Sequence, residues 1–215
     1  MRAEINLYNA DCLPAMKKMA DNQYDLAIVD PPYNVGASNG MFGGHPGSYR
    51  PDLKHYTNYN KTPNKEYFNE LFRISKNQII WGSNYYPQYL YHSGAIIWWK
   101  KDYGPLSDAE IAFQSFSKIV SVIKHKWSGF NKEKSDKNII RIHPNQKPVA
   151  LYKWLLKNYA KEGDKILDTH GGSMSIAIAC WDYGYDLDAY EIDKDYFEAG
   201  KKRLETHKAQ LQLYD

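Results

Sequence analysis

The chain has 215 residues, of which 43% are hydrophobic, and a formal net charge of +3. This length suits one domain with a core that needs no disulfides. The two cysteines, Cys12 and Cys180, lack the spacing of a metal site, so we predict no metal and a reducing cytoplasm. No apolar run reaches the length of a membrane span and no signal peptide is apparent, so we expect no membrane partner.

The positive charge is concentrated in one part of the chain. Residues 117–165 contain twelve Lys or Arg against four acidic residues, a net charge of +8. Lysines interleaved with aromatic residues such as Trp127, Phe130 and Trp154 suit a nucleic-acid backbone, because the cations attract phosphates and the rings can stack. A solvated lysine-rich surface is the alternative.

The first third of the chain predicts a βαβ unit, with a strand at Glu4–Tyr8, a helix at Leu13–Met19 and a strand at Tyr24–Val29. A unit of this kind has parallel strands, so Asp11 and Asp30 should lie at the same sheet edge. The alternative for Asp11 is a helix cap.

The second strand ends at Asp30-Pro31-Pro32-Tyr33. Two prolines cannot extend a strand, so this tetrapeptide should lie at the carboxyl edge, where open α/β sheets bind ligands. It offers an acceptor carboxylate, prolyl carbonyls and a flat ring, which suit a planar base with an amino group. An ordinary Pro-Pro turn is the alternative.

Residues 34–63 lose periodicity and are rich in Gly and Pro. An irregular stretch of this length is usually functional, and its position after the tetrapeptide favours a flap over the site; plain surface disorder is the alternative.

Regular elements then resume. We predict a helix at Lys65–Ser75, strands at Gln78–Trp81 and Ala95–Trp99, and a hairpin formed by Ala109–Phe116 and Ile119–Lys126. Trp98 and Trp99 are predicted in the core, with a stacking platform as the alternative. A basic insertion at about 117–141 contacts DNA in this prediction, and its part from Trp127 to Ile140 is expected to be irregular.

Two further stretches carry polar side chains at helix starts. His143-Pro144-Asn145-Gln146-Lys147-Pro148 precedes a helix at Val149–Tyr159; these residues could simply start the helix or could close over a cofactor. A strand at Lys165–Leu167 leads into Asp168-Thr169-His170-Gly171-Gly172-Ser173 and a helix from Ser175 to Trp181.

The next strand ends at Glu191, before a helix from Asp193 to about His207. A small-residue turn with an acid at the following strand end predicts a nucleoside-cofactor site without a phosphate loop. On these features alone, a dinucleotide oxidoreductase is also possible.

The combination of DPPY, HPNQKP, DTHGGS and YEID resembles the S-adenosylmethionine-dependent DNA amino-methyltransferases of the permuted class, in which the catalytic motif precedes the cofactor motif. WGSNYY at Trp81–Tyr86 and SDAE at Ser107–Glu110 extend the resemblance over nearly the whole chain, which looks most like small phage-type adenine-specific members. The resemblance implies an α/β, Rossmann-like fold: a mainly parallel sheet with a terminal antiparallel hairpin, helices on both faces, and the first strand beside the one ending at Glu191.

The resemblance also implies roles for these residues. Asp30, Pro31, Pro32 and Tyr33 would be catalytic. The cofactor S-adenosylmethionine would contact Asp11, Cys12, Asp30, His143, Asn145, Gln146, Lys147, Asp168, Thr169, His170, Gly171, Gly172, Ser173, Glu191, Ile192 and Asp193. Within this set, Asp168 and its turn would hold the methionine end, Glu191 the ribose, and Asp11 with Cys12 the adenine edge.

The function implied is site-specific methylation of adenine N6 in double-stranded DNA with the target base flipped out, by one catalytic domain spanning residues 1–215. A homodimer, a restriction-modification context and a bacterial or phage-infected cytoplasm are the associated expectations. N4-cytosine methylation is an alternative, and so is a DNA-binding module with weakened catalysis. The latter is suggested by Gly172-Ser173-Met174, where the family usually shows Gly-Ser-Gly, because a side chain there predicts weaker cofactor binding.

Overall fold

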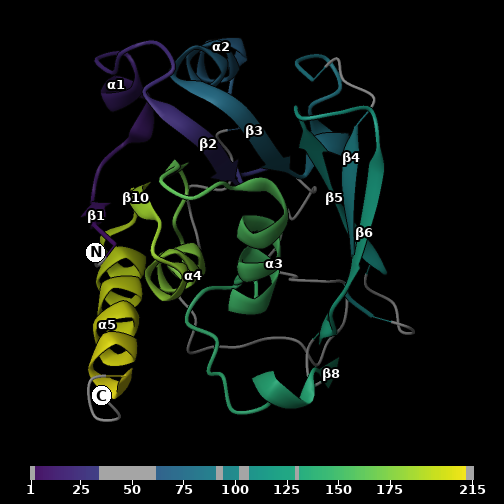
Figure 1. Cartoon of the computed structure of the whole chain (residues 1–215), viewed down its shortest axis with the longest axis vertical. Helices are drawn as coiled ribbons and strands as arrows, with labels where there is room; N and C mark the ends of the chain where they lie inside the picture. The colour runs from purple at the N-terminus through teal and green to yellow at the C-terminus, as the bar shows by residue number, and fades with distance from the viewer. Residues whose placement is uncertain (1–2, 34–61, 91–93, 102–106, 129–130, 212–215) are drawn as a thin grey trace.

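A computed structural model describes residues 3–33, 62–90, 94–101, 107–128 and 131–211 (Figure 1). The predicted flap therefore lies almost entirely outside the described residues. The main-sheet strands are β1 (Ile5–Tyr8), β2 (Tyr24–Val29), β3 (Ser75–Trp81), β4 (Ala95–Trp99), β5 (Ala109–Gln114), β6 (Val120–Lys124), β9 (Lys165–Asp168) and β10 (Asp186–Tyr190). The helices are α1 (Cys12–Met16), α2 (Lys65–Ile74), α3 (Val149–Tyr159), α4 (Ser175–Tyr183) and α5 (Lys194–Leu211).

In the described part of the chain the main sheet has the order β1-β10-β9-β2-β3-β5-β4-β6. The pairs from β1 through β3 are all parallel, and β5 is antiparallel to both β3 and β4. The predicted Rossmann-like α/β fold is confirmed, including the first strand beside the one that leads to Glu191. A short ribbon of β7 (Trp127–Ser128) and β8 (Asn131–Lys132) and two 3-10 turns, η2 (Ser83–Tyr85) and η3 (Lys134–Asp136), complete the elements.

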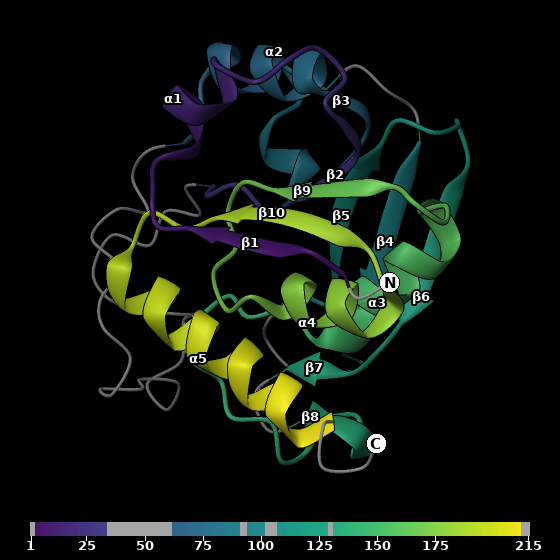
Figure 2. The ribbon, with the colours of Figure 1, turned by 60° about the vertical axis from the view of Figure 1, so that its left-hand side comes forward.

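Helices cover both faces of the sheet, as Figure 2 shows. One face packs against α1 and α2 through residues such as Met16, Phe68 and Leu71. The other face packs against α3, α4 and α5, with Leu155 and Ile178 among the buried side chains. The central strand β2 is buried almost throughout, which is expected for a parallel strand covered on both sides.

The predicted hairpin between 109–116 and 119–126 is wrong in its pairing. Strand β6 runs antiparallel to β5, as in a hairpin, but β4 is inserted between them: Ile97 pairs with Ile111 on one side and with Val122 on the other. The side chain of Gln114 stabilises the wide connection by donating to the carbonyls of Ser117 and Ile119. The apolar sequence of β4 suits this interior position better than an edge.

The paired tryptophans of β4 also differ from the prediction that both lie in the core. Trp98 is buried and packs edge-to-face on Trp81, whereas Trp99 is 42% exposed with the Lys124 ammonium 5.0 Å from its ring centroid. Successive side chains of a strand point to opposite faces, and near the sheet edge only one face is covered.

Candidate active site

Four parallel strands place the predicted acidic residues at one edge of the sheet. Ala27 of β2 is level with Leu167 of β9, and Ala189 of β10 is level with Asp168. Asp30 and Glu191 follow directly at the ends of their strands, and the backbone N–H of Glu191 donates to the carbonyl of Tyr8 at 3.0 Å. The carboxyl edge therefore brings together motifs that lie up to 161 residues apart in the sequence, from Asp30 to Glu191.

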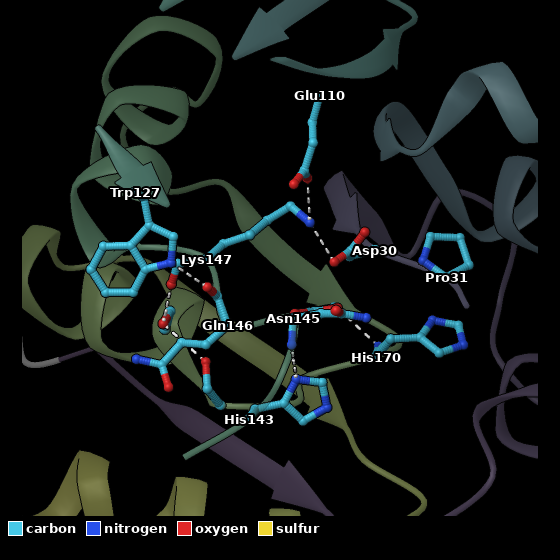
Figure 3. Close-up of polar contacts among 12 residues, drawn as sticks. Asp30, Pro31, Glu110, Trp127, His143, Asn145, Gln146, Lys147 and His170 are labelled. Carbon is cyan, nitrogen blue, oxygen red and sulfur yellow. Dashed lines mark hydrogen bonds and ion pairs between the residues drawn. The ribbon is translucent and has the colours of Figure 1, made fainter. Parts of the chain in front are cut away.

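Asp30 is held on one side only. Its Oδ2 accepts a hydrogen bond from Lys147 Nζ at 2.5 Å (Figure 3). Its Oδ1 is buried and has no hydrogen-bond partner among the described residues. Burial raises the pKa of this carboxyl above its ordinary value, while the charge of Lys147 opposes the rise. A buried acceptor without a donor costs free energy, which is typical of a position that a ligand completes.

The prolines of the tetrapeptide are fixed by a residue that sequence reasoning did not single out. The buried hydroxyl of Tyr86 donates to the Pro32 carbonyl at 2.6 Å and approaches the Pro31 carbonyl at 3.1 Å. A carbonyl oxygen has two lone pairs, so Pro31 retains capacity for another donor.

The ring of Tyr33 is stacked on Tyr85, with centroids 4.4 Å apart and an interplanar angle of 6°. Gly82 approaches the same ring: a Cβ at this position would lie 2.6 Å from Tyr33 Cδ1, and its φ of +68° also favours glycine. The turn after β3 therefore sets the position of this aromatic face.

Asp168 is a buried carboxyl at the end of β9. Burial raises its pKa to about 8, and its Oδ1 accepts from the backbone N–H of His170 at 2.9 Å. Across the described ranges no Lys or Arg forms an ion pair with it. A carboxyl in this state suits a ligand that brings a positive charge, such as the ammonium of an amino acid.

Glu191 organises the turn beside Asp168. Its two carboxylate oxygens accept from the backbone N–H groups of Gly172 and Asp193, each at 2.8 Å. Gly172 has a φ of +51°, which L side chains rarely adopt, and the Gly171 N–H donates to the Tyr190 carbonyl at 2.7 Å. The acid therefore joins the two strand-end loops.

The side chain of Met174, which follows this turn, is packed inside the protein. It is fully buried with a φ of +55°, and its side chain fills the space in front of Gly171 and Gly200. A Cβ on Gly200 would lie 2.6 Å from Met174 Cγ. The extra side chain is thus accommodated by a glycine on α5.

The HPNQKP segment is tied down at several points. The Gln146 carbonyl accepts from Trp127 Nε1 at 2.6 Å, and the Lys147 carbonyl accepts from Ser175 Oγ at 2.7 Å. His143 packs edge-to-face on Tyr196, and burial lowers its pKa to about 4. The segment therefore joins the start of α3 to α4 and α5.

Other predicted residues have evident structural partners. Asp11 caps α1 by accepting from the Leu13 N–H at 3.0 Å, and Asp193 caps α5. Burial raises the pKa of the Cys12 thiol to about 12. The Ile192 side chain is 53% exposed. A cofactor role for these residues stays a prediction.

Trp127 is buried beneath the cations of Lys132 and Arg141, so it packs in the core and cannot stack on a nucleic acid. Sequence reasoning also missed partners inside the site. Glu110 and Lys100 join Lys147, and the Tyr67 hydroxyl shares a 2.7 Å hydrogen bond with Thr169. Only the SDAE motif gave a signal for Glu110.

A Rossmann-like sheet with a glycine turn and acids at its carboxyl edge is the arrangement of a nucleoside-cofactor enzyme. The model of the N6/N4 DNA methylase family matches residues 53–202, and the chain belongs to this family of DNA methyltransferases. The cofactor of the family is S-adenosylmethionine.

Relatives extend along most of the chain. Type II methyltransferase M.HpaI of Haemophilus parainfluenzae is 24% identical over 241 residues, covering 92% of this chain and 73% of its own. DNA adenine methyltransferase YhdJ of Escherichia coli K12 is 26% identical, covering 93% of this chain and 82% of its own.

Solved structures share the fold. The M1.HpyAVI–SAM complex superimposes with a TM-score of 0.61 at 20% identity, covering 93% of this chain and all of the other. The cytosine-N4-specific PvuII DNA methyltransferase gives a TM-score of 0.61 at 12% identity, covering 94% and 87%. In the described part of the chain, no helix is long and apolar enough to cross a membrane.

Proposed function

We propose that this protein transfers a methyl group from S-adenosylmethionine to the N6 amine of adenine in DNA. The observation that carries the proposal is the buried Asp30 Oδ1, an acceptor without a donor among the described residues, beside prolyl carbonyls and an aromatic ring. The DNA adenine methyltransferase YhdJ, which matches most of the chain, supports adenine as the base.

The acceptors explain how the amine becomes reactive. An exocyclic amine is a poor nucleophile because its lone pair is delocalised into the ring. Two acceptors on its hydrogens, Asp30 Oδ1 and the Pro31 carbonyl, would favour a tetrahedral nitrogen with a localised lone pair. Tyr86 fixes the carbonyl and Lys147 fixes the carboxylate, so both acceptors are oriented before the base arrives.

The residues at the edge fit the cofactor. Asp168 offers a buried carboxyl that forms no ion pair with a Lys or Arg of the described residues, and the Gly171-Gly172 turn allows close backbone approach. Asp168 would hold the methionine end and Glu191 the ribose, with Asp11 and Cys12 at the adenine edge. S-adenosylmethionine supplies a methyl group already activated on a sulfonium.

The chain's own contribution to transfer is alignment. With the amine held at Asp30 and the methionine end at Asp168, these two residues would place the amine nitrogen in line with the methyl group that the bound cofactor would supply. The methylated amine would then lose one proton, which Asp30 Oδ1 could accept.

We propose that the DNA is double-stranded and that the target base leaves the helix, since its amine is otherwise paired. Unstacking costs a few kcal/mol, which stacking on the Tyr33 ring would help to offset. The incoming base would either stack on the face of this ring opposite Tyr85 or displace Tyr85. The basic insertion at 117–141 and the segment 34–63 are proposed to contact DNA within one catalytic domain of residues 1–215.

The first test is Asp30→Ala assayed with tritiated S-adenosylmethionine and DNA. Methyl transfer should fall below detection while calorimetry finds cofactor affinity within about threefold of wild type, because the anchors at Asp168 and Glu191 remain. Undiminished transfer in the variant would refute the assignment. A wild-type protein that binds DNA but no cofactor would instead favour a DNA-binding module.

The target base requires a separate measurement. Mass spectrometry of nucleosides from methylated DNA should find N6-methyladenine. The shared fold of the cytosine-N4-specific PvuII enzyme makes N4-methylcytosine the specific alternative, and its detection would replace adenine with cytosine. A homodimer and a partner restriction enzyme are further proposals, which light scattering and the genomic context can test.

A further inference from the structure

A chain of four alternating charges leads away from the catalytic tetrapeptide. Lys147 Nζ lies 2.5 Å from Asp30 Oδ2 and 3.1 Å from Glu110 Oε2 (Figure 3). Glu110 Oε1 in turn lies 2.6 Å from Lys100 Nζ. The charges come from the end of β2, the segment before α3, β5 and the residue after β4. The Lys147 side chain is only 4% exposed, so solvent screens this chain weakly.

The two carboxylates hold Lys147 differently. Its contact with Asp30 has hydrogen-bond geometry, whereas Glu110 Oε2 makes no hydrogen bond in the described structure and acts through charge. Because the ammonium is shared, its full charge is not available to Asp30. Removing Glu110 would therefore draw the negative charge of Asp30 more tightly to Lys147 and weaken Asp30 as an acceptor.

We propose that Glu110 and Lys147 are positioning residues for Asp30: Lys147 holds Oδ2 so that Oδ1 is left for the target amine, and Glu110 shares the lysine's charge so that Oδ1 remains a strong acceptor. This inference deepens the proposed function and rests on it. It also gives Lys147 a role at the reacting base, where the sequence predicted one at the cofactor.

Other ionisable groups lie around Asp30 and could contribute to the pH dependence of the rate. They are Lys100, Asp168 and the phenols of Tyr33, Tyr86 and Tyr152 in the described structure. Burial raises the pKa of every one of these phenols, so none ionises between pH 4 and 9. Asp168 titrates within this range, and the charge of Lys147 lowers its pKa, so its titration also moves in Lys147→Met. Glu110→Gln leaves Lys147 in place, and its comparison with wild type is therefore the one that reports Asp30.

The variants should move the titration of Asp30 in opposite directions. Glu110→Gln removes a negative charge and should shift the acid limb of the single-turnover methylation rate to lower pH by about one unit. Lys147→Met removes the counterion and should shift that limb to higher pH by about one unit, with a rate at least about tenfold lower. A merely structural role would lower the rate without moving the limb.

Glu70→Gln is the matched control. Glu70 is 20% exposed against 22% for Glu110, and it also pairs with a cation at 2.6 Å, Arg73 on the same helix α2. Its acid limb should coincide with that of wild type. Thermal unfolding of each variant shows that the rates refer to folded protein, and if Lys147→Met does not fold, the Glu110→Gln arm decides alone.

A readout without substrate separates this inference from the proposed function. The ¹³Cγ carboxyl signal of Asp30, assigned by its loss in Asp30→Asn, should titrate at lower pH in Glu110→Gln than in wild type. If neither the NMR titration of Asp30 nor the acid limb of the rate moves in Glu110→Gln, the positioning role of Glu110 is refuted, even if the wild-type enzyme methylates adenine. If the wild-type protein does not methylate DNA but Glu110→Gln shows the expected NMR shift, the proposed function is refuted, whereas the electrostatic coupling of Glu110 to Asp30 is supported.

Discussion

Replacing Asp168 by Asn should make the cofactor-free protein more stable at alkaline pH. The carboxyl is only 2% exposed, and burial raises its pKa from 3.8 to about 8. Asn Oδ1 can still accept from the His170 N–H but carries no charge to desolvate. The substitution therefore isolates the cost of keeping an ionisable group in this position.

The sign follows from the two pKa values. Below pH 3.8 the carboxyl is protonated in both states and its contribution to stability is fully present. As the pH rises, Asp168 ionises first in the unfolded chain, which lowers the free energy of that state. The unfolding free energy therefore falls with pH until the Asp168 carboxyl of the folded protein also ionises near pH 8. A gap of about four pKa units at ~1.4 kcal/mol each gives a ceiling of ~6 kcal/mol. Relaxation around the charge lowers this, and we expect ~2–4 kcal/mol.

Urea unfolding of wild type and Asp168→Asn at pH 4, 6 and 8 provides the assay. The two unfolding free energies should agree within ~1 kcal/mol at pH 4 and diverge steadily in favour of the variant up to pH 8. Asp25 is the control of opposite sign, since its backbone bond from Lys165 and its ion pair with Lys76 lower its pKa. Asp25→Asn should have a lower unfolding free energy than wild type at pH 8. This difference should shrink toward acid pH, because the wild type loses the contribution of Asp25 as that carboxyl is protonated. Parallel curves for wild type and Asp168→Asn would refute the reasoning.

Three further predictions concern the same edge. Cofactor binding at pH 7 should release close to one proton as Asp168 ionises beside the methionine ammonium; calorimetry in two buffers of different ionisation enthalpy detects it, and Asp168→Asn should show none. Gly200→Ala should lower the unfolding free energy by ~2 kcal/mol, because the added methyl group would press on Met174. In the Met174→Ala background the same substitution should cost at most half as much, and additive effects of the two substitutions would contradict this contact. Tyr86→Phe should cost ~1–2 kcal/mol in denaturant unfolding and slow methyl transfer, because it leaves the prolyl carbonyls of the motif without their donor; an unchanged rate would show that the hydroxyl does not orient them.

The sequence determined the parts of the fold that depend on local pattern. The buried run of β2, closed by two prolines, predicts a strand at Tyr24–Val29, and the structure has β2 with these bounds. The apolar periodicity of α3 gave a helix at Val149–Tyr159 with the predicted bounds. Parallel connections then required the acids after β2, β9 and β10 to share an edge.

Strand pairing at the other end of the sheet was decided by tertiary structure. The turn residues between β5 and β6 indicate that the strands run in opposite directions, but not whether another strand lies between them. Strand β4 (Ala95–Trp99) takes the position between them, where its backbone pairs with β5 on one side and with β6 on the other. The space for the Met174 side chain was also decided by tertiary structure. It exists because residue 200 on α5 is a glycine, and no local motif links these two positions.

What the sequence by itself determined is the set of chemical groups at the carboxyl edge: the DPPY acceptors, the glycine turn and the acids that follow the parallel strands. Only the tertiary structure decided how those groups are charged and oriented. Lys147, 117 residues from Asp30, was predicted to contact the cofactor, yet its ammonium lies between Asp30 and Glu110. Ion pairing inside a protein depends on distances between elements far apart in the chain, and the order of residues along the chain does not contain those distances.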